Sequence, residues 1–128
     1  MFKILADKTI CLTRGDVCNI NVTATMSDGS NYVFTPGDVV RLKVFSKKDS
    51  DDVQIQKDVL VQDETQSVVI GLVKEDTRLG DTINKPFDYW YEIELNPDTE
   101  PQTIIGYDQD GEKIFRLYPD GGDLNVTS

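Results

Sequence analysis

A chain of 128 residues with 38% hydrophobic residues is long enough to enclose one core, so a single domain is expected over residues 1–122. Its 23 acidic and 13 basic residues give a formal net charge of -10, which repels phosphate backbones and anionic lipids and argues against nucleic-acid or membrane partners. Histidine is absent and there are two cysteines, which excludes Ser-His-Asp and Cys-His catalysis and ordinary tetrahedral zinc sites.

The N-terminal stretch lacks the long apolar segment of a secretory signal, and no window approaches the roughly 18 apolar residues of a membrane span. Synthesis in the cytosol as a soluble protein is therefore expected. Residues 123–128 are polar and are expected to form a C-terminal tail.

The first element lies at residues 9–23, where TICLTRGDVCNINVT contains an Arg-Gly-Asp triplet. Adhesion receptors bind this triplet at the tip of a mobile loop, whereas here it lies between two strand-like segments. We therefore interpret Arg14 and Gly15 as the two-residue turn of a β-hairpin, with a positive φ at Gly15. Arg14 and Asp16 are then expected to be solvated, and both are possible interface residues.

Cys11 and Cys18 would face each other across this hairpin, close enough for a disulfide. A directly opposed disulfide is strained and the cytosol is reducing, so two buried thiols are expected, with a disulfide as the alternative. The triplets that begin at Asn21 and Asn125 match the glycosylation motif, but without secretory targeting both are expected to be unmodified.

Three segments alternate apolar and polar residues as half-buried strands do. The apolar sets are Cys18, Ile20, Val22, Ala24 and Met26 in residues 18–26, Val40, Leu42 and Val44 in residues 39–46, and Tyr89, Tyr91, Ile93 and Leu95 in residues 88–95. These segments are predicted to be central strands.

Weaker strand candidates are rich in β-branched or aromatic residues. They cover residues 8–13, 31–35, 53–61, 67–72, 101–108 and 112–118. Turn signals separate them at short intervals, which favours an antiparallel sandwich or barrel. One segment, residues 74–80, is predicted to form about two helical turns that end at Gly80.

Residues 107–113, YDQDGEK, offer the oxygens of Asp108, Asp110 and Glu112, as the start of a calcium loop does. A complete loop needs further ligands at set spacing and flanking helices. A hairpin turn with Gly111 near its apex is therefore expected, with adventitious calcium binding as the alternative. No cofactor or metal site is predicted.

Glu92 and Glu94 are predicted to project from one strand face beside Trp90, and glycosidases use paired carboxylates with an aromatic platform. Such acids on a strand are more often solvated, and a small chain has little room for a deep cleft. A non-enzymatic protein with no catalytic residue is therefore expected. Trp90 should point away from Tyr89 and Tyr91, which makes it a possible interface anchor.

Several motifs follow one another in an order typical of a known family. They are LTRGD, TPGDVVRLKVFSKKD, VVIGLVKEDTRLG, and YWYEIEL followed by IIGYDQDGEKIFRLYPDGGD. This order, over nearly the whole chain, resembles the N-terminal domain family of phage baseplate upper proteins, which occur in tailed phages and prophages of Gram-positive bacteria. The resemblance implies an immunoglobulin-like β-sandwich that docks onto the tail or baseplate. Family members usually carry further domains for host contact after this one, whereas this chain ends at Ser128. An adaptor or decoration role is therefore expected in place of direct host binding.

The leading hypothesis is an all-β, immunoglobulin-like antiparallel β-sandwich with one short helical turn. It is a non-enzymatic phage or prophage structural protein located in the virion, with other phage structural proteins as partners and an oligomeric state in the assembly. One alternative is a module that binds host-surface carbohydrate or protein through residues 28–31 or 49–52. The other is a small hydrolase that uses Glu92 and Glu94.

Overall fold

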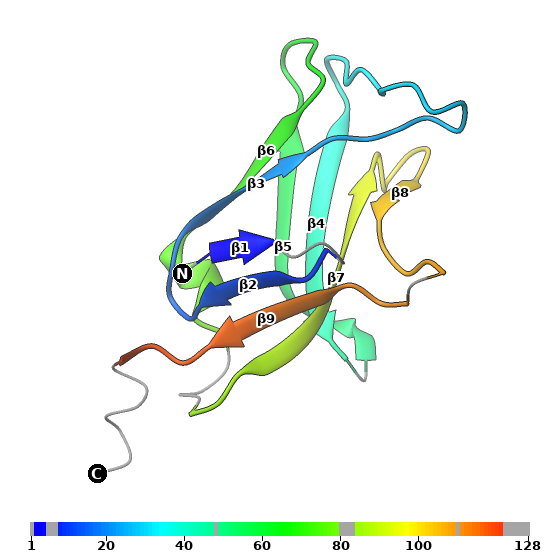
Figure 1. Cartoon of the computed structure of the whole chain (residues 1–128). Helices are drawn as coiled ribbons and strands as arrows, with labels where there is room; N and C mark the ends of the chain where they lie inside the picture. The colour runs from blue at the N-terminus through cyan, green and yellow to red at the C-terminus, as the bar shows by residue number, and fades with distance from the viewer. Residues whose placement is uncertain (1, 5–7, 48, 80–83, 110, 122–128) are drawn as a thin grey trace.

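The computed structural model describes residues 2–4, 8–47, 49–79, 84–109 and 111–121, and its regular structure is almost entirely β-strand (Figure 1). The elements are β1 (Phe2–Ile4), β2 (Ile10–Thr13), β3 (Cys18–Val22), β4 (Val39–Ser46), β5 (Asp49–Leu60), β6 (Val68–Leu72), α1 (Lys74–Thr77), β7 (Phe87–Leu95), β8 (Gln102–Ile105) and β9 (Ile114–Tyr118).

The strands form a large sheet and a two-stranded sheet. In the large sheet the order is β1-β2-β9-β7-β4-β5, and β8 pairs with the part of β7 that β9 leaves free. The small sheet consists of β3 and β6, paired antiparallel. β2 and β9 run parallel, whereas the other neighbours in the large sheet are antiparallel. The expectation of a wholly antiparallel fold is therefore wrong at this pair, which joins opposite ends of the chain.

The predicted inward faces of the three strongest strands are confirmed. The buried sets are Cys18, Ile20 and Val22 in β3, Val40, Leu42 and Val44 in β4, and Tyr89, Tyr91, Ile93 and Leu95 in β7. Side chains from both sheets join in one hydrophobic cluster, in which each buried aliphatic side chain contributes about 1.5–3 kcal/mol. β3 ends at Val22, so Met26 lies outside the strand and is 51% exposed, contrary to its predicted inward position.

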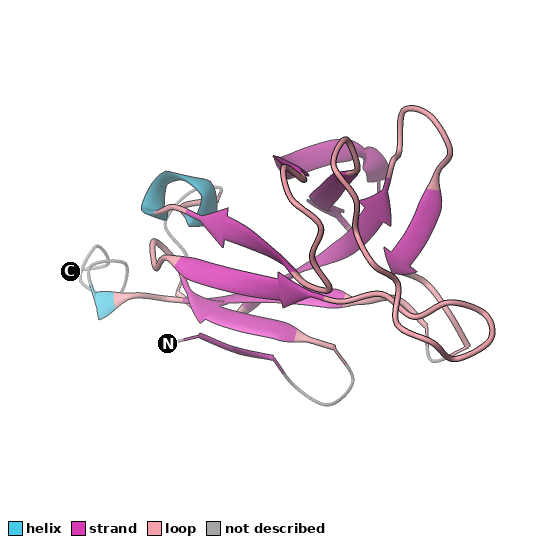
Figure 2. Ribbon diagram, turned by 90° about the horizontal axis from the view of Figure 1, so that it is seen from above, coloured by secondary structure: helices cyan, strands magenta, loops and turns pink. Residues whose placement is uncertain are grey.

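The predicted hairpin at residues 9–23 is wrong, because β2 and β3 belong to different sheets. Figure 2 shows the strands and their connecting loops from above. Residues 14–17 connect the two sheets. Gly15 does adopt the predicted positive φ, +88°, and a Cβ there would lie 2.9 Å from the Arg78 guanidinium. The local turn chemistry was therefore predictable, whereas the partner of the next strand, β6, lies far away in the sequence.

Helix α1 is shorter than predicted: it spans Lys74–Thr77, a single turn, and Gly80 lies outside the described residues. The Asp76 carboxylate accepts a hydrogen bond from the Val73 N–H at 2.9 Å and so satisfies one free donor at the N-terminus of the helix. Thr77 is fully buried and donates its hydroxyl to the Asp16 carbonyl at 2.7 Å, which ties the turn to the connection between the sheets. None of the helical residues described here forms a segment long and apolar enough to cross a bilayer.

Five of the weaker strand candidates are confirmed as β2, β5, β6, β8 and β9, while β1 was not predicted. Residues 31–35 form isolated bridges instead of a strand, linking Thr25 to Asn31 and Phe34 to Thr65. Phe34 is fully buried, so this segment contributes to the core as an anchored loop.

Both cysteines are free and buried, at 1% exposed for Cys11 and 7% for Cys18, as expected. They do not face each other across a hairpin, because their strands lie in different sheets. Burial, together with the charges of Asp16 and Asp76, raises the pKa of the Cys18 thiol to about 11. Since the thiolate is the nucleophilic form, Cys18 is protected by its location and by its protonation state.

We predict that the thiols of the native protein react with a chromogenic disulfide reagent roughly a hundredfold more slowly than those of the urea-unfolded chain, because burial shields both sulfurs. Absorbance after mixing measures the rate. Val17→Cys is the control, since Val17 is 65% exposed in the same connection and its replacement adds one fast-reacting thiol. Two fast thiols in the folded wild-type protein would contradict the buried positions.

Candidate functional site

Trp90 lies on the outward face of β7, opposite to Tyr89 and Tyr91, as predicted. It is half-buried rather than exposed, and strand pairing places it between Phe45 of β4 and Ile114 of β9. Its indole Nε1 is buried and has no hydrogen-bond partner in the part of the chain that the structure describes. Its role as an interface anchor stays a prediction.

Arg14 is buried, 9% exposed, so the expectation of a solvated arginine is wrong. Its Nε donates to the Leu79 carbonyl at 3.2 Å, and the neighbouring Asp16 is half-buried. Burial raises the pKa of Tyr89, and the charge of Arg14 opposes this shift. Because Arg14 is buried, it is not available as an exposed interface residue in this structure.

The calcium-like sequence is a closed turn. Asp108 and Gly111 exchange backbone hydrogen bonds of 3.2 and 2.9 Å, and the Asp108 carboxylate accepts a 2.8 Å bond from Lys113 Nζ. The predicted hairpin is wrong, because β8 and β9 both pair with β7 and not with each other. Asp110 lies outside the described residues, and no cluster of metal-ligating side chains occurs among those described.

The two loops of the host-binding alternative have different structures. The Asp28 carboxylate accepts bonds from the Ser30 hydroxyl at 2.6 Å and the Ser30 N–H at 2.9 Å, and these bonds lower its pKa. Residues 49–52 belong to β5 and do not form a separate loop.

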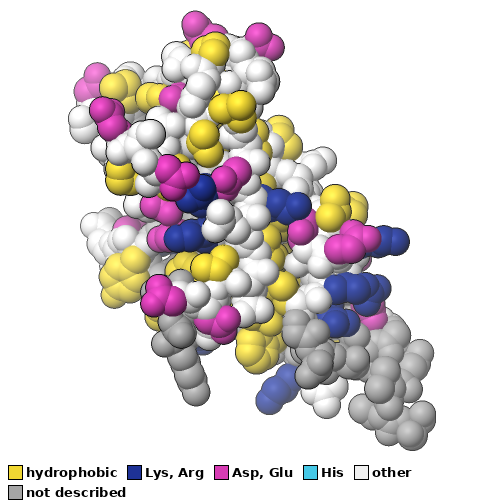
Figure 3. All heavy atoms as spheres, turned by 180° about the vertical axis from the view of Figure 1, so that it is seen from behind, with side chains coloured by type: hydrophobic (Ala, Val, Ile, Leu, Met, Phe, Trp, Pro, Cys, Tyr) yellow, Lys and Arg dark blue, Asp and Glu magenta, His cyan; other side chains and the backbone are white. Residues whose placement is uncertain are grey.

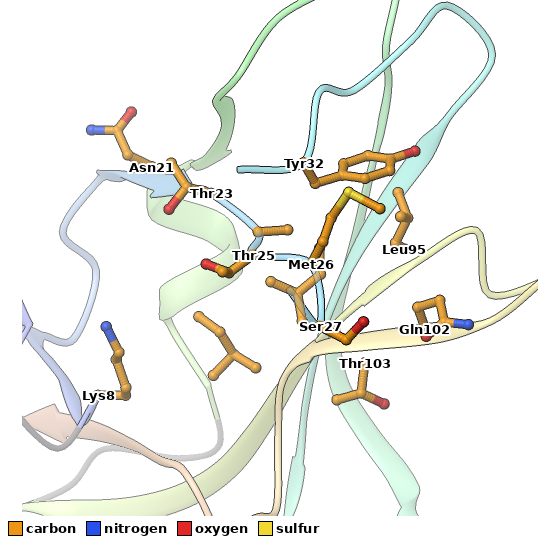
Figure 4. Close-up of a pocket in the computed structure, with 13 residues that line it drawn as sticks. Lys8, Asn21, Thr23, Thr25, Met26, Ser27, Tyr32, Leu95, Gln102 and Thr103 are labelled. Atoms are coloured by element: carbon orange, nitrogen blue, oxygen red, sulfur yellow. The ribbon is translucent and has the colours of Figure 1, made fainter. Parts of the chain in front are cut away.

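A cavity of about 670 Å³ opens between the chain that follows β3 and strand β8 (Figure 4). Asn21, residues 23–27 and Tyr32 line one side, and the four residues of β8 with Leu95 line the other. Figure 4 shows Lys8 at the end opposite to Leu95 and Gln102, with Met26 beneath the ring of Tyr32. This cavity could not be predicted from the sequence, because its walls come from three distant parts of the chain.

A second cavity of about 250 Å³ continues along β8. It shares Lys8, Thr103, Ile104 and Ile105 with the first cavity and extends to Tyr107 and Lys113. We call the two together the β8 groove. Two exposed side chains stand at its ends, Met26 at 51% and Tyr107 at 79%.

Among the described residues that line the larger cavity, Lys8 is the one with a charged side chain, and that side chain is exposed. Its backbone has φ +72°, a conformation that costs a non-glycine residue free energy. The Tyr91 hydroxyl donates a 2.6 Å hydrogen bond to the Lys8 carbonyl. Because Tyr91 is buried in β7, this bond ties the position of Lys8 to the large sheet.

A hydrogen-bond network supports the opposite wall of the groove. The buried Asp38 carboxylate accepts bonds from the Tyr32 hydroxyl at 2.7 Å, the Thr35 N–H at 3.0 Å and Asn96 Nδ2 at 3.1 Å. Burial by itself raises the pKa of Asp38, but these bonds more than offset it, so the pKa lies below its ordinary value of 3.8. Tyr32 also packs edge-on against Phe34, with ring centroids 5.1 Å apart. The Tyr32 ring is therefore held in place from two directions.

Glu92 and Glu94 lie outside the groove, on the outward face of β7. The register places Glu92 beside Lys43 and Glu94 beside Arg41 of β4. Burial and then the charge of Glu94 raise the pKa of Glu92, while Lys43 lowers it. Neither glutamate lines the β8 groove, and the view from behind shows acidic and basic side chains interspersed (Figure 3). The pair belongs to a ladder of cross-strand charges.

Comparison of the chain with protein-family models, curated proteins and solved structures finds no match in any of the three.

We predict that Asp38→Ala lowers the free energy of unfolding by about 2 kcal/mol, because three donors lose their acceptor. Urea denaturation followed by circular dichroism measures the change. The folded pKa of Asp38 lies below the unfolded value, so its stabilisation is complete above about pH 4 and is lost as the pH falls through the folded value. The difference between the wild type and Asp38→Ala should therefore shrink in acid.

Asp28→Ala is the matched control, since Asp28 is fully exposed and bonds within its own turn. Its effect should be clearly smaller than that of Asp38→Ala, as for surface substitutions in general. Equal effects of the two substitutions would show that the Asp38 network does not stabilise the fold.

Proposed function

We propose that this protein is a non-enzymatic structural component of a phage or prophage virion. In this role it acts as an adaptor in the tail or baseplate, with other phage structural proteins as partners. The resemblance in motif order to the N-terminal domain family of phage baseplate upper proteins supports the proposal, as does a fold that is mostly β. We include in the proposal the immunoglobulin-like β-sandwich that this resemblance implies.

The observation that carries the proposal is the β8 groove. Its lining combines apolar side chains with hydroxyl and amide groups (Figure 4). Surfaces of this composition bind proteins well, since apolar contacts supply affinity and polar groups supply orientation. An adaptor needs such a surface in addition to a stable core.

The carboxylate pair favours the structural role over hydrolysis. Glycosidases place two carboxylates on either side of a bound sugar. Glu92 and Glu94 instead lie along one strand beside Lys43 and Arg41, outside the groove. Their surroundings match those of a charged outer sheet face.

We predict that the protein co-purifies with virions from the producing strain and occupies one end of the tail. Density-gradient particles analysed by mass spectrometry and by antibody labelling in negative-stain images provide the measurement. A stop codon early in the gene should give particles with an incomplete tail end, and a synonymous change at the same codon is the control. Absence from purified particles, with the protein present in the lysate, would overturn the proposal.

A further inference from the structure

Strand β8 has one paired edge and one open edge. It pairs with β7 through Ile105 opposite Ile93, Thr103 opposite Glu94 and Gln102 opposite Leu95. β4 occupies the other edge of β7, and no strand among the described residues pairs with the second edge of β8. Backbone N–H and C=O groups on an open edge are ready to pair with another strand.

The floor of the groove beside this edge is apolar because β8 contains a bulge. The register shifts between Ile93 and Glu94, which leaves Ile104 as an extra residue in β8. Consecutive residues of a regular strand point to opposite faces, but a bulge re-aims one of them. Ile104 and Ile105 thus both pack against the hydrophobic core cluster while lining the groove.

The facing wall is the end of β3 and the chain that follows it, which present Asn21, Thr23 and Thr25 to the groove. Figure 4 shows these side chains along one side of the cavity, with Met26 and Tyr32 at its apolar end. The space between this wall and β8 therefore offers apolar contact at the floor and polar contact at the side. An extended backbone with alternating side chains fits both surfaces.

The charge of the groove differs from that of the chain. The chain has 23 acidic residues and a formal net charge of -10, yet among the described residues the larger cavity is lined by one charged side chain, Lys8, and by no acid. The second cavity adds Lys113 and Asp108, which pair with each other at 2.8 Å. Lys8 forms no ion pair with any carboxylate among the described residues. A groove with this charge attracts an acidic side chain and not a basic one.

We propose that the β8 groove binds an extended segment of a partner protein, which adds to the open edge of β8 as a further strand. The segment places β-branched or other apolar side chains over Ile104 and Ile105, and a carboxylate at Lys8. β8 has four residues, or roughly 13 Å of strand, so the segment pairs over about four to six residues. This inference rests on the proposed function, because it assigns the adaptor a surface for its partner.

A partner of different sequence fits the groove better than a second copy of this chain. Two copies each carry a formal charge of -10 and repel one another, which opposes self-pairing at this edge. A partner segment with only one or two carboxylates can pair with Lys8 at a much smaller long-range penalty than a second copy of charge -10.

The test uses a displayed library of random seven-residue peptides selected on the immobilised wild-type protein. The expected result is enrichment of β-branched sequences that contain Asp or Glu. Binding of the recovered peptides, measured by fluorescence anisotropy, should weaken at least roughly tenfold with Lys8→Glu and less than roughly twofold with Lys47→Glu, an exposed lysine outside the groove. Lys8→Gln should give an intermediate loss.

A second arm leaves the protein unchanged, in case a variant fails to fold. Copies of a recovered peptide with N-methylated backbone amides cannot donate the hydrogen bonds of strand addition and should bind at least roughly tenfold more weakly. Amide NMR shifts on binding should concentrate at residues 102–105. The proposal is overturned by a lack of enrichment, by equal binding of the methylated peptide, or by shifts that map elsewhere.

Two further outcomes separate this inference from the proposed function. If the wild type and Lys8→Glu both enter virions at equal levels, the groove assignment fails while the structural role stands. If the wild type itself is absent from virions, the structural role fails whatever the peptides do. Self-association of the wild type in sedimentation, lost in Lys8→Glu, would assign the groove to a second copy and overturn the partner segment.

Discussion

Strand β7 is the element on which the rest of the structure depends, because it supports three other strands. β4 pairs along one of its edges, while β9 and then β8 share the other. On the other edge of β9, β2 pairs with β9 and β1 pairs with β2. β8 has no second neighbour among the described residues. The large sheet thus becomes narrower part of the way along β7 (Figure 1). The β8 groove lies beside this narrower part.

Burial along individual strands could be predicted from the sequence, because the two-residue period of a strand is a local property. Strand pairing could not, since it joins distant segments: β2 pairs with β9 and β3 with β6, so the hairpin expected around Gly15 is absent. The groove combines Lys8 with Asn21, residues 23–27 and residues 102–105. Neither the bulge at Ile104 nor the open edge of β8 has a signature in the sequence, because both depend on which part of β7 is left free.

The charged side chains are distributed unequally between the outer strand faces and the groove. Arg41 forms ion pairs with Asp58 at 2.8 Å and Asp98 at 3.0 Å, and Arg116 pairs with Asp88 at 2.7 Å. Each exposed pair contributes only about 0–1 kcal/mol to stability. Their larger effect is to place opposite charges across from each other on neighbouring strands, with the acidic residues on the outer faces.

The separation of the two cysteines into different sheets has a consequence for the environments in which the protein can work. Both thiols are free and buried, and neither has the other as its cross-strand partner. The fold therefore does not depend on a disulfide, and its stability is the same in a reducing cytosol and in an oxidising exterior. In the role proposed for it, the protein is made in the first environment and acts in the second, without any change in its covalent structure.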